Sequence, residues 1–280
     1  MTWDSTGHAV VQTFVNGKGP FDFIFDTGAD ESAVYAWFAK SQNLPKGSNK
    51  ELTGATGSVD ITATRLSSLS LDGHAISDVE VDTVPDRLDG AKLAGVAGID
   101  LMKGRLAVLD FGCGTAALLP LETVPREIFG KNATLIQAGS IKDGEQLTLP
   151  VTVNGASGVA VLDSGARLTQ INYKFAAAAK LAPESAEFRD GEPTRGATMK
   201  AINVRIGPIG TVVFAGITRR DAVARVGDLP YLEGAGLANA PAMNLGLDLL
   251  RGTRLTVDYS SRRFWLAGSS CALPSTKTEH

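Results

Sequence analysis

The chain has 280 residues, of which 44% are hydrophobic and 20% are charged, and its formal net charge at pH 7 is −3. This composition is typical of a globular protein that buries its core in one large domain or in two smaller ones. Because there is no basic excess, nucleic acid and anionic membranes are poor candidates for partners. No apolar stretch is long enough to span a bilayer.

The start of the chain, MTWDSTGHAV, lacks the charged and then apolar layout of a secretion signal. The sequence leaves two localisations open: periplasmic or secreted if a signal peptide was trimmed, and otherwise cytoplasmic. The Ala-rich, Cys-poor composition fits a bacterium.

Cysteine and histidine are both rare in this chain. Cys113 and Cys271 are too few and too far apart for a zinc site or a disulfide framework, and two separate buried thiols are favoured over a bridge between them. His8, His74 and His280 have no metal-ligand spacing. The sequence therefore predicts neither a metal nor a cofactor.

The first half contains a strand that ends in an acid. An apolar strand is predicted over residues 21–25, after an Asn-Gly turn, and it runs into Asp26 of an Asp-Thr-Gly-Ala tetrapeptide. A buried carboxylate is costly unless something holds it, so this strand end needs a structural or a chemical reason. Three short elements are predicted to follow: a helix over 33–40, a glycine-rich hairpin over 52–60 and a helical turn over 100–103.

The second half repeats these landmarks in the same order. Residues 151–169 again contain an Asn-Gly turn, an apolar strand and an Asp-Ser-Gly-Ala tetrapeptide, whose acid is Asp163. A helix capped by Asn172 is predicted over 172–180, followed by a second Gly-Ala-Thr segment and a helical turn over 248–251. The order of the landmarks indicates an internal duplication.

Short alternating strands between glycine-rich turns predict an all-β fold, with 31 glycines in the chain. We expect an N-terminal lobe over 1–125 that carries Asp26 and a C-terminal lobe over 140–280 that carries Asp163. The connection is expected at about 119–146, and its interior has room for an edge strand.

The duplication explains why each half has a buried strand that ends in an acid. If the halves pack about an approximate two-fold axis, Asp26 faces Asp163. Two carboxylates this close cannot both ionise, so they share one proton and serve as an acid and a base on a water held between them. The residues expected to support the pair come from the same two tetrapeptides: Thr27, Gly28, Ser164 and Gly165.

These motifs resemble the aspartic proteases of the pepsin and retropepsin type. The resemblance also includes the apolar-apolar-Gly step at residues 96–98 and the looser step Asn-Leu-Gly at 244–246. It implies a bilobal acid-protease fold, catalytic Asp26 and Asp163, supporting Thr27 and Ser164, and a cleft that binds an extended peptide.

The chain departs from the pepsin pattern at the flap over the cleft, because residues 52–60 contain no tyrosine. Since Gly-Ala-Thr occurs in both halves, we expect two glycine-rich flaps, closer to a retropepsin dimer fused into one chain. The substrate-binding residues expected in these flaps are Gly54, Ala55, Thr56, Gly196, Ala197 and Thr198. The apolar strands around both motifs predict a preference for apolar residues flanking the scissile bond.

The expected function is that of an aspartic endopeptidase that acts as a monomer on a peptide or protein substrate. Two alternatives stay open: a catalytically silent peptide-binding module of the same fold, and a narrow processing protease for one partner protein.

Overall fold

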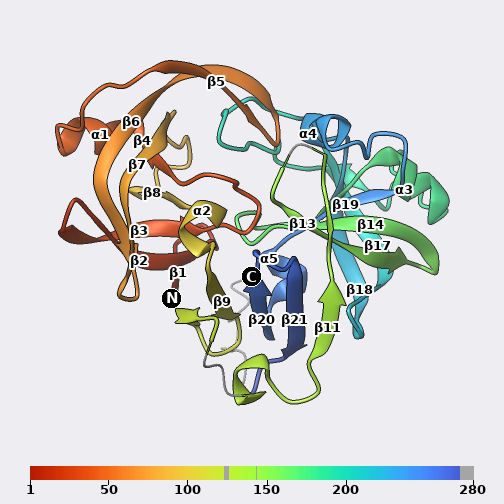
Figure 1. Cartoon of the computed structure of the whole chain (residues 1–280). Coiled ribbons are helices and arrows are strands. Elements are labelled where there is room, and N and C mark those ends of the chain that lie inside the picture. Colours follow the sequence, from red (N-terminus) through yellow and green to blue (C-terminus); the bar gives the residue numbers. More distant parts are fainter. Residues whose placement is uncertain (123–125, 143, 272–280) are drawn as a thin grey trace.

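Three β-sheets form the fold of this computed structural model, which describes residues 1–122, 126–142 and 144–271 (Figure 1). The first eight-stranded sheet has the order β1-β2-β3-β8-β4-β7-β6-β5, and the second has the order β12-β13-β14-β19-β15-β18-β17-β16. The two orders match strand for strand. The expected all-β class and the bilobal architecture are therefore confirmed.

The strands of the first sheet are β1 (Thr2–Trp3), β2 (Ala9–Val15), β3 (Lys18–Phe25), β4 (Ala33–Tyr35), β5 (Asn49–Gly54), β6 (Gly57–Leu71), β7 (His74–Val84) and β8 (Gly95–Ala97). Those of the second are β12 (Gly139–Ser140), β13 (Leu147–Val153), β14 (Ala156–Leu162), β15 (Gln170–Ile171), β16 (Arg189–Asp190), β17 (Arg205–Phe214), β18 (Ile217–Val226) and β19 (Ala242–Leu245).

The hairpin that leads to each acid has the same turn in both halves. Asn16 and Gly17 connect β2 to β3 with φ of 52° and 72°, and Asn154 and Gly155 connect β13 to β14 with φ of 49° and 83°. Positive φ at both central positions is the requirement of a two-residue type I′ turn, which Asn-Gly satisfies well. These turns set the register of the strands that end at the two acids.

A third sheet joins the halves. Its order is β10-β9-β20-β21-β11, and β9 of the first half pairs antiparallel with β20 of the second. Figure 1 shows it below and between the two eight-stranded sheets. Its strands are β9 (Arg105–Asp110), β10 (Thr115–Pro120), β11 (Thr134–Gln137), β20 (Thr253–Asp258) and β21 (Arg263–Gly268). The edge strand β11 falls within the segment expected to connect the lobes.

The helices are short: α1 (Ala36–Ser41), α2 (Ile99–Met102), α3 (Tyr173–Ala178), α4 (Pro230–Gly234), α5 (Leu247–Leu250) and the 3₁₀ helix η1 (Arg126–Phe129). The cap predicted for α3 is confirmed, since Asn172 Oδ1 accepts from the N–H of Phe175 at 2.8 Å. No helix within the described ranges is long and apolar enough to cross a membrane.

The prediction of a helix over 33–40 is wrong for its first three residues. Residues 33–35 form β4, which pairs with both β7 and β8, and the helix begins only at Ala36. All three residues of β4 are buried, so the ladder with two neighbouring strands overrides any local helical preference.

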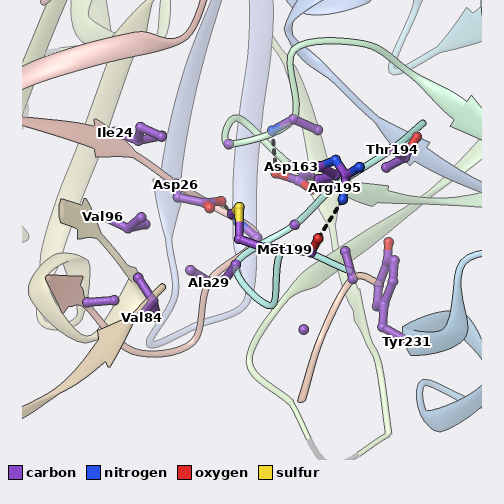
Figure 2. Close-up of a pocket in the computed structure, with 18 of the residues that line it drawn as sticks. Ile24, Asp26, Ala29, Val84, Val96, Asp163, Thr194, Arg195, Met199 and Tyr231 are labelled. Atoms are coloured by element: carbon purple, nitrogen blue, oxygen red, sulfur yellow. Dashed lines mark hydrogen bonds between the residues drawn. The ribbon is translucent and has the colours of Figure 1, made fainter. Parts of the chain in front are cut away.

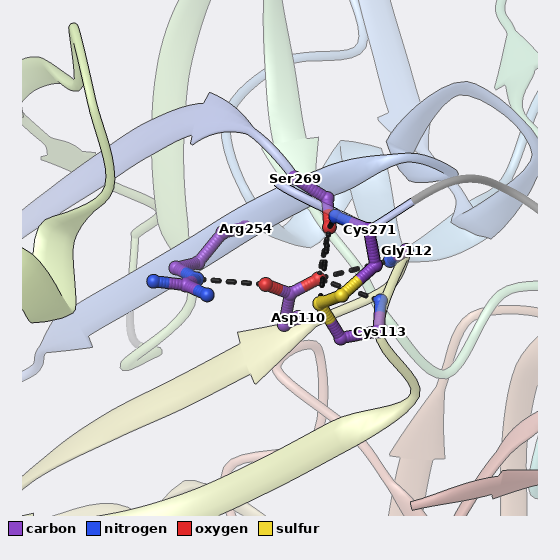
Figure 3. Close-up of a disulfide and its surroundings, with 6 residues drawn as sticks. All are labelled: Asp110, Gly112, Cys113, Arg254, Ser269 and Cys271. Atoms are coloured by element: carbon purple, nitrogen blue, oxygen red, sulfur yellow. Dashed lines mark hydrogen bonds and ion pairs between the residues drawn. A yellow bond between two sulfur atoms is a disulfide. The ribbon is translucent and has the colours of Figure 1, made fainter.

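The interpretation of the cysteines as separate thiols is also wrong. Cys113 and Cys271 form a disulfide with their Cα atoms 5.0 Å apart (Figure 3). The third sheet is the reason, because it brings the end of β21 beside the turn between β9 and β10. Asp110 supports this corner: it accepts hydrogen bonds from the N–H of Cys113 at 2.8 Å and from Ser269 Oγ at 2.6 Å, and it pairs with Arg254 Nε at 2.7 Å.

Candidate active site

Each predicted acid directly follows a buried strand and is fixed by the strand beside it. Asp26 follows β3, and its N–H donates to the carbonyl of Ala97 in β8 at 3.0 Å. Asp163 follows β14, and its N–H donates to the carbonyl of Leu245 in β19 at 3.1 Å. The two parallel pairs, β3 with β8 and β14 with β19, thus place the acids in equivalent positions.

Four buried hydrogen bonds lock the two acid loops together across the halves. Thr27 Oγ1 donates to the carbonyl of Leu162 at 3.0 Å and accepts from the N–H of Ser164 at 2.9 Å. Ser164 Oγ donates to the carbonyl of Phe25 at 2.6 Å and accepts from the N–H of Thr27 at 3.0 Å. Thr27 and Ser164 are only 1% and 0% exposed, so water does not compete for these bonds.

The glycine of each tetrapeptide packs against the opposite carboxyl group. A Cβ on Gly28 would lie 2.7 Å from Cγ of Asp163, and a Cβ on Gly165 would lie 2.1 Å from Oδ2 of Asp26. Both distances are far shorter than a van der Waals contact, so a side chain at either position would displace an acid. The N–H of Gly28 also donates to Asp26 Oδ1 at 2.7 Å.

The carboxyl groups of Asp26 and Asp163 hydrogen-bond one another and differ in electrostatic environment. Burial, followed by the negative charge of Asp163, raises the pKa of Asp26 well above its ordinary value. Burial also raises the pKa of Asp163, but the amide of Asn244 and the N–H of Ala166 oppose this rise. The pair therefore retains a proton above the ordinary aspartate range, and Asp26 is the better place for it.

Two residues at the site were missed by sequence reasoning. Asn244 Nδ2 donates to Asp163 Oδ2 at 2.7 Å, and Tyr231 Oη in α4 donates to Asn244 Oδ1 at 2.5 Å. In the sequence Asn244 was only a loose match to an apolar position. Tyr231 carried no signal, because it belongs to no repeated motif.

The two acids form the floor of a pocket of about 720 Å³, a size that suits a small-molecule or peptide ligand. Figure 2 shows Asp26 and Asp163 pointing toward one another from opposite sides. The labelled side chains near Asp26 are apolar, namely Ile24, Ala29, Val84 and Val96, whereas those near Asp163 include Thr194, Arg195 and Tyr231.

The two Gly-Ala-Thr segments meet at this pocket. Residues 54–56, here called the first tip, form the turn between β5 and β6, and residues 196–198, the second tip, lie in the loop between β16 and β17. The buried hydroxyls of Thr56 and Thr198 hydrogen-bond each other at 2.8 Å. The two tips are held differently. The first is the turn of a hairpin of two paired strands, whereas the second is flanked by the isolated bridge between Thr194 and Ile202.

In each half, one further hydrogen bond between a hydroxyl and a carboxylate supports the loop that carries the acid. Ser32 Oγ donates to Asp100 Oδ1 at 2.6 Å, and Thr169 Oγ1 donates to Asp248 Oδ1 at 2.6 Å. The same carboxylates accept from backbone N–H groups in the first turn of α2 and α5. Asp100 and Asp248 thus have a structural role in the first turns of α2 and α5, whose N-cap residues are Gly98 and Gly246.

Among residues 1–122, 126–142 and 144–271, no group of three or more His, Cys, Asp and Glu side chains is arranged to hold a metal ion.

A family model described as aspartyl protease matches the chain twice, at residues 11–101 and 149–249. Each match contains one acid tetrapeptide and one of the strands β8 and β19. No curated protein matches the chain. The two matches cover more than half of the chain and coincide with the structural repeat, so the protein belongs to the aspartyl protease family.

Proposed function

We propose that the protein is an aspartic endopeptidase in which Asp26 and Asp163 activate one water molecule for attack on a peptide bond. Membership of the family supports a protease-type hydrolase that acts on peptides or proteins. The observation that carries the finer proposal is the pair of buried carboxyls, held face to face on the floor of the pocket by the Thr27 and Ser164 hydrogen bonds.

The unequal surroundings of the acids suggest a role for each. Asp163, whose charged form is stabilised by Asn244, is the base that takes a proton from the water. Asp26 holds the shared proton and donates it to the carbonyl oxygen as the water oxygen bonds to the carbonyl carbon. When the C–N bond breaks, the proton on Asp163 passes to the leaving nitrogen, and a hydroxyl proton of the intermediate returns to Asp26.

The two tips are proposed to act as flaps over the substrate. An extended peptide would hydrogen-bond to their backbones, with side chains alternating into the pocket. Entry of the peptide would break the bond between Thr56 and Thr198, a neutral hydrogen bond whose net contribution is about 1 kcal/mol. This cost is small enough for opening to be frequent.

We further propose that one chain is a complete enzyme, with lobes 1–125 and 140–280 supplying one acid each. The Cys113–Cys271 disulfide favours the periplasmic or secreted location of the two left open, because disulfides persist in oxidising compartments.

The test is cleavage of a mixed peptide library from about pH 3 to 8, the range in which carboxyl pairs titrate. Cleavage by the wild type that is lost in both Asp26→Asn and Asp163→Asn is the expected result. Asp22→Asn is the matched control, since Asp22 is an exposed acid of the same strand β3. Peptide binding without cleavage would favour the silent module, and cleavage of one native protein alone would favour the processing protease.

A further inference from the structure

The two halves of the pocket carry opposite charges at equivalent positions. Asp30 and Arg167 each lie four residues after the acid of their half. Asp82 of β7 pairs with Ala33 of β4, and Arg225 of β18 pairs with Gln170 of β15, which are equivalent strands. Asp30, Asp82, Arg167 and Arg225 all line the pocket. The two halves therefore carry opposite charges at these two pairs of equivalent positions.

The carboxylates on the Asp26 side already have partners. Asp82 pairs with Lys50 Nζ at 2.7 Å, and Asp30 accepts from the N–H of Glu145 at 2.9 Å. Lys50 also pairs with Glu31 at 2.9 Å. The carboxylates of Asp30 and Asp82 are thus already bonded, and apolar side chains such as Ile24, Val84 and Val96 also line the pocket on this side.

The arginines on the Asp163 side are not neutralised in this way. Arg225 Nη1 donates to Thr194 Oγ1 at 3.1 Å, while its Nε is buried without a hydrogen-bond partner. Arg167 Nη1 donates to the carbonyl of Thr6 at 2.9 Å. Within the part of the chain that the structure describes, neither guanidinium forms an ion pair with a carboxylate.

The two guanidinium groups also affect one another. Burial, followed by the positive charge of Arg167, lowers the pKa of Arg225, and the negative charges of Glu192 and Asp248 oppose this effect. Arg225 is a half-buried cation that has an N–H without a hydrogen-bond partner and a second cation nearby. A bound anion would therefore stabilise it. A carboxylate suits it best, because its two oxygens match the donor geometry of a guanidinium.

We propose that Arg167 and Arg225 form a subsite that binds a carboxylate of the substrate on the Asp163 side of the pocket. This inference rests on the proposed function and narrows its substrate class: peptides with an apolar side chain on one side of the scissile bond and a carboxylate on the other. The carboxylate has two possible sources, the side chain of Asp or Glu and the C-terminus of a peptide.

The experiment compares matched peptides that carry Asp or Asn, and Glu or Gln, at each position around the cleaved bond, with the C-terminus either free or amidated. For the wild type we expect kcat/KM to be about ten-fold or more higher for the acid than for its amide at one position, as expected of a charge-assisted bond. A preference for the acid at an internal position would show that the subsite binds a side-chain carboxylate. A preference for the free C-terminus would show that it binds the terminal carboxylate.

Three variants test the residues. Arg225→Gln is expected to abolish the preference for the acid peptide, while its cleavage of the amide peptide stays within about two-fold of the wild type. Arg167→Gln is expected to weaken the preference for the acid peptide. Arg225→Lys keeps the charge and is expected to retain part of the preference. The matched control is Arg220→Gln, since Arg220 is an exposed residue of the same strand β18 that does not line the pocket. Equal cleavage of acid and amide by the wild type, or an equal loss on both in Arg225→Gln, would overturn the inference.

Binding separates this inference from the proposed function. If the wild type cleaves no peptide, the same pairs are titrated against Asp26→Asn by fluorescence anisotropy at about pH 6 and about pH 3, on either side of the carboxyl pKa. Tighter binding of the acid peptide at the higher pH, lost in the double variant with Arg225→Gln, supports the subsite even when the endopeptidase proposal has failed. Equal binding of acid and amide, or no binding of either, refutes it.

Discussion

Asn244 donates its side-chain amide hydrogen to Asp163 at 2.7 Å, whereas Val96, which offers no side-chain donor, occupies the equivalent place beside Asp26. The two positions have the same register: Val96 lies opposite Ile24 and Asn244 opposite Val161. The pseudo-symmetric pair of acids is therefore chemically asymmetric, which is the basis for assigning the base to Asp163.

Replacing Asn244 by the residue of the other half tests this assignment. In Asn244→Val the charged form of Asp163 loses its donor, so its pKa rises and the acidic limb of the pH–activity profile moves to higher pH. We expect kcat/KM on that limb to fall by about ten-fold, the effect of losing one hydrogen bond to a charged group. Tyr231→Phe, which removes only the donor to Asn244, should cause a smaller change in the same direction. An acidic limb that does not move in Asn244→Val would contradict the assignment.

The raised pKa of Asp26 predicts how stability depends on pH. Because the folded protein holds this proton more tightly than an aspartate of pKa 3.8 does, the stabilising contribution of the carboxyl is complete below that pH and is lost as the pH rises through the folded pKa. The Tm of Asp26→Asn relative to the wild type should therefore increase from about pH 3.5 to about pH 8. Differential scanning calorimetry across this range measures it, with Asp22→Asn, a change at an exposed position of the same strand, as the control.

The hydrogen bonds between the acid loops predict a loss of stability in Thr27→Ala. This change leaves the carbonyl of Leu162 and the N–H of Ser164 buried without their partner, at a cost of about 2–4 kcal/mol in the free energy of unfolding. Urea titration checks the value. Thr218→Ala, at an exposed position of β18, serves as the control and should change stability by less than about 0.5 kcal/mol.

The close approach of Gly28 to Asp163 predicts a large loss of activity in Gly28→Ala. The added Cβ would displace the Asp163 carboxyl from its place opposite Asp26, and we expect kcat to fall by about a hundred-fold or more. Gly268→Ala is the matched control, because a Cβ at Gly268 would meet no atom within 4 Å. Unchanged kcat in Gly28→Ala would show that the carboxyl pair tolerates displacement.

The disulfide predicts a stability difference without an activity difference. Replacing both cysteines by serine should lower the free energy of unfolding by about 2–5 kcal/mol, while kcat/KM stays within about two-fold, since the bridge lies in the third sheet and not at the pocket. Urea titrations with and without reductant measure the difference. Reductant should destabilise the wild type and leave the double variant unchanged.

Much of the fold and of the acid pair was predictable because repetition makes local patterns specific. The Asn-Gly turns, the apolar strands that end at Asp26 and Asp163, and the cap at Asn172 are each determined by a few neighbouring residues. Their recurrence in one order ties them to a single architecture.

What was missed depends on contacts between distant segments. The Cys113–Cys271 bridge needs the pairing of β9 with β20 and of β20 with β21, and the strand character of residues 33–35 comes from β7 and β8. Tyr231 reaches the site because Leu229 and Leu232 on either side of it pack with Val161 of β14 and Ala242 of β19. Arg225 reaches the pocket through the pairing of β18 with β15, which gives it the position that Asp82 has in the other half, and no local pattern of the sequence indicates this.

The shared sheet limits how this molecule can open. Since β9 and β20 come from different halves and are hydrogen-bonded neighbours, swinging the halves apart would break a continuous β-ladder that the bridge at Cys271 also braces. We therefore expect a polypeptide to enter by bending of the long β5–β6 hairpin away from residues 196–198, with the acids held stationary beneath it throughout.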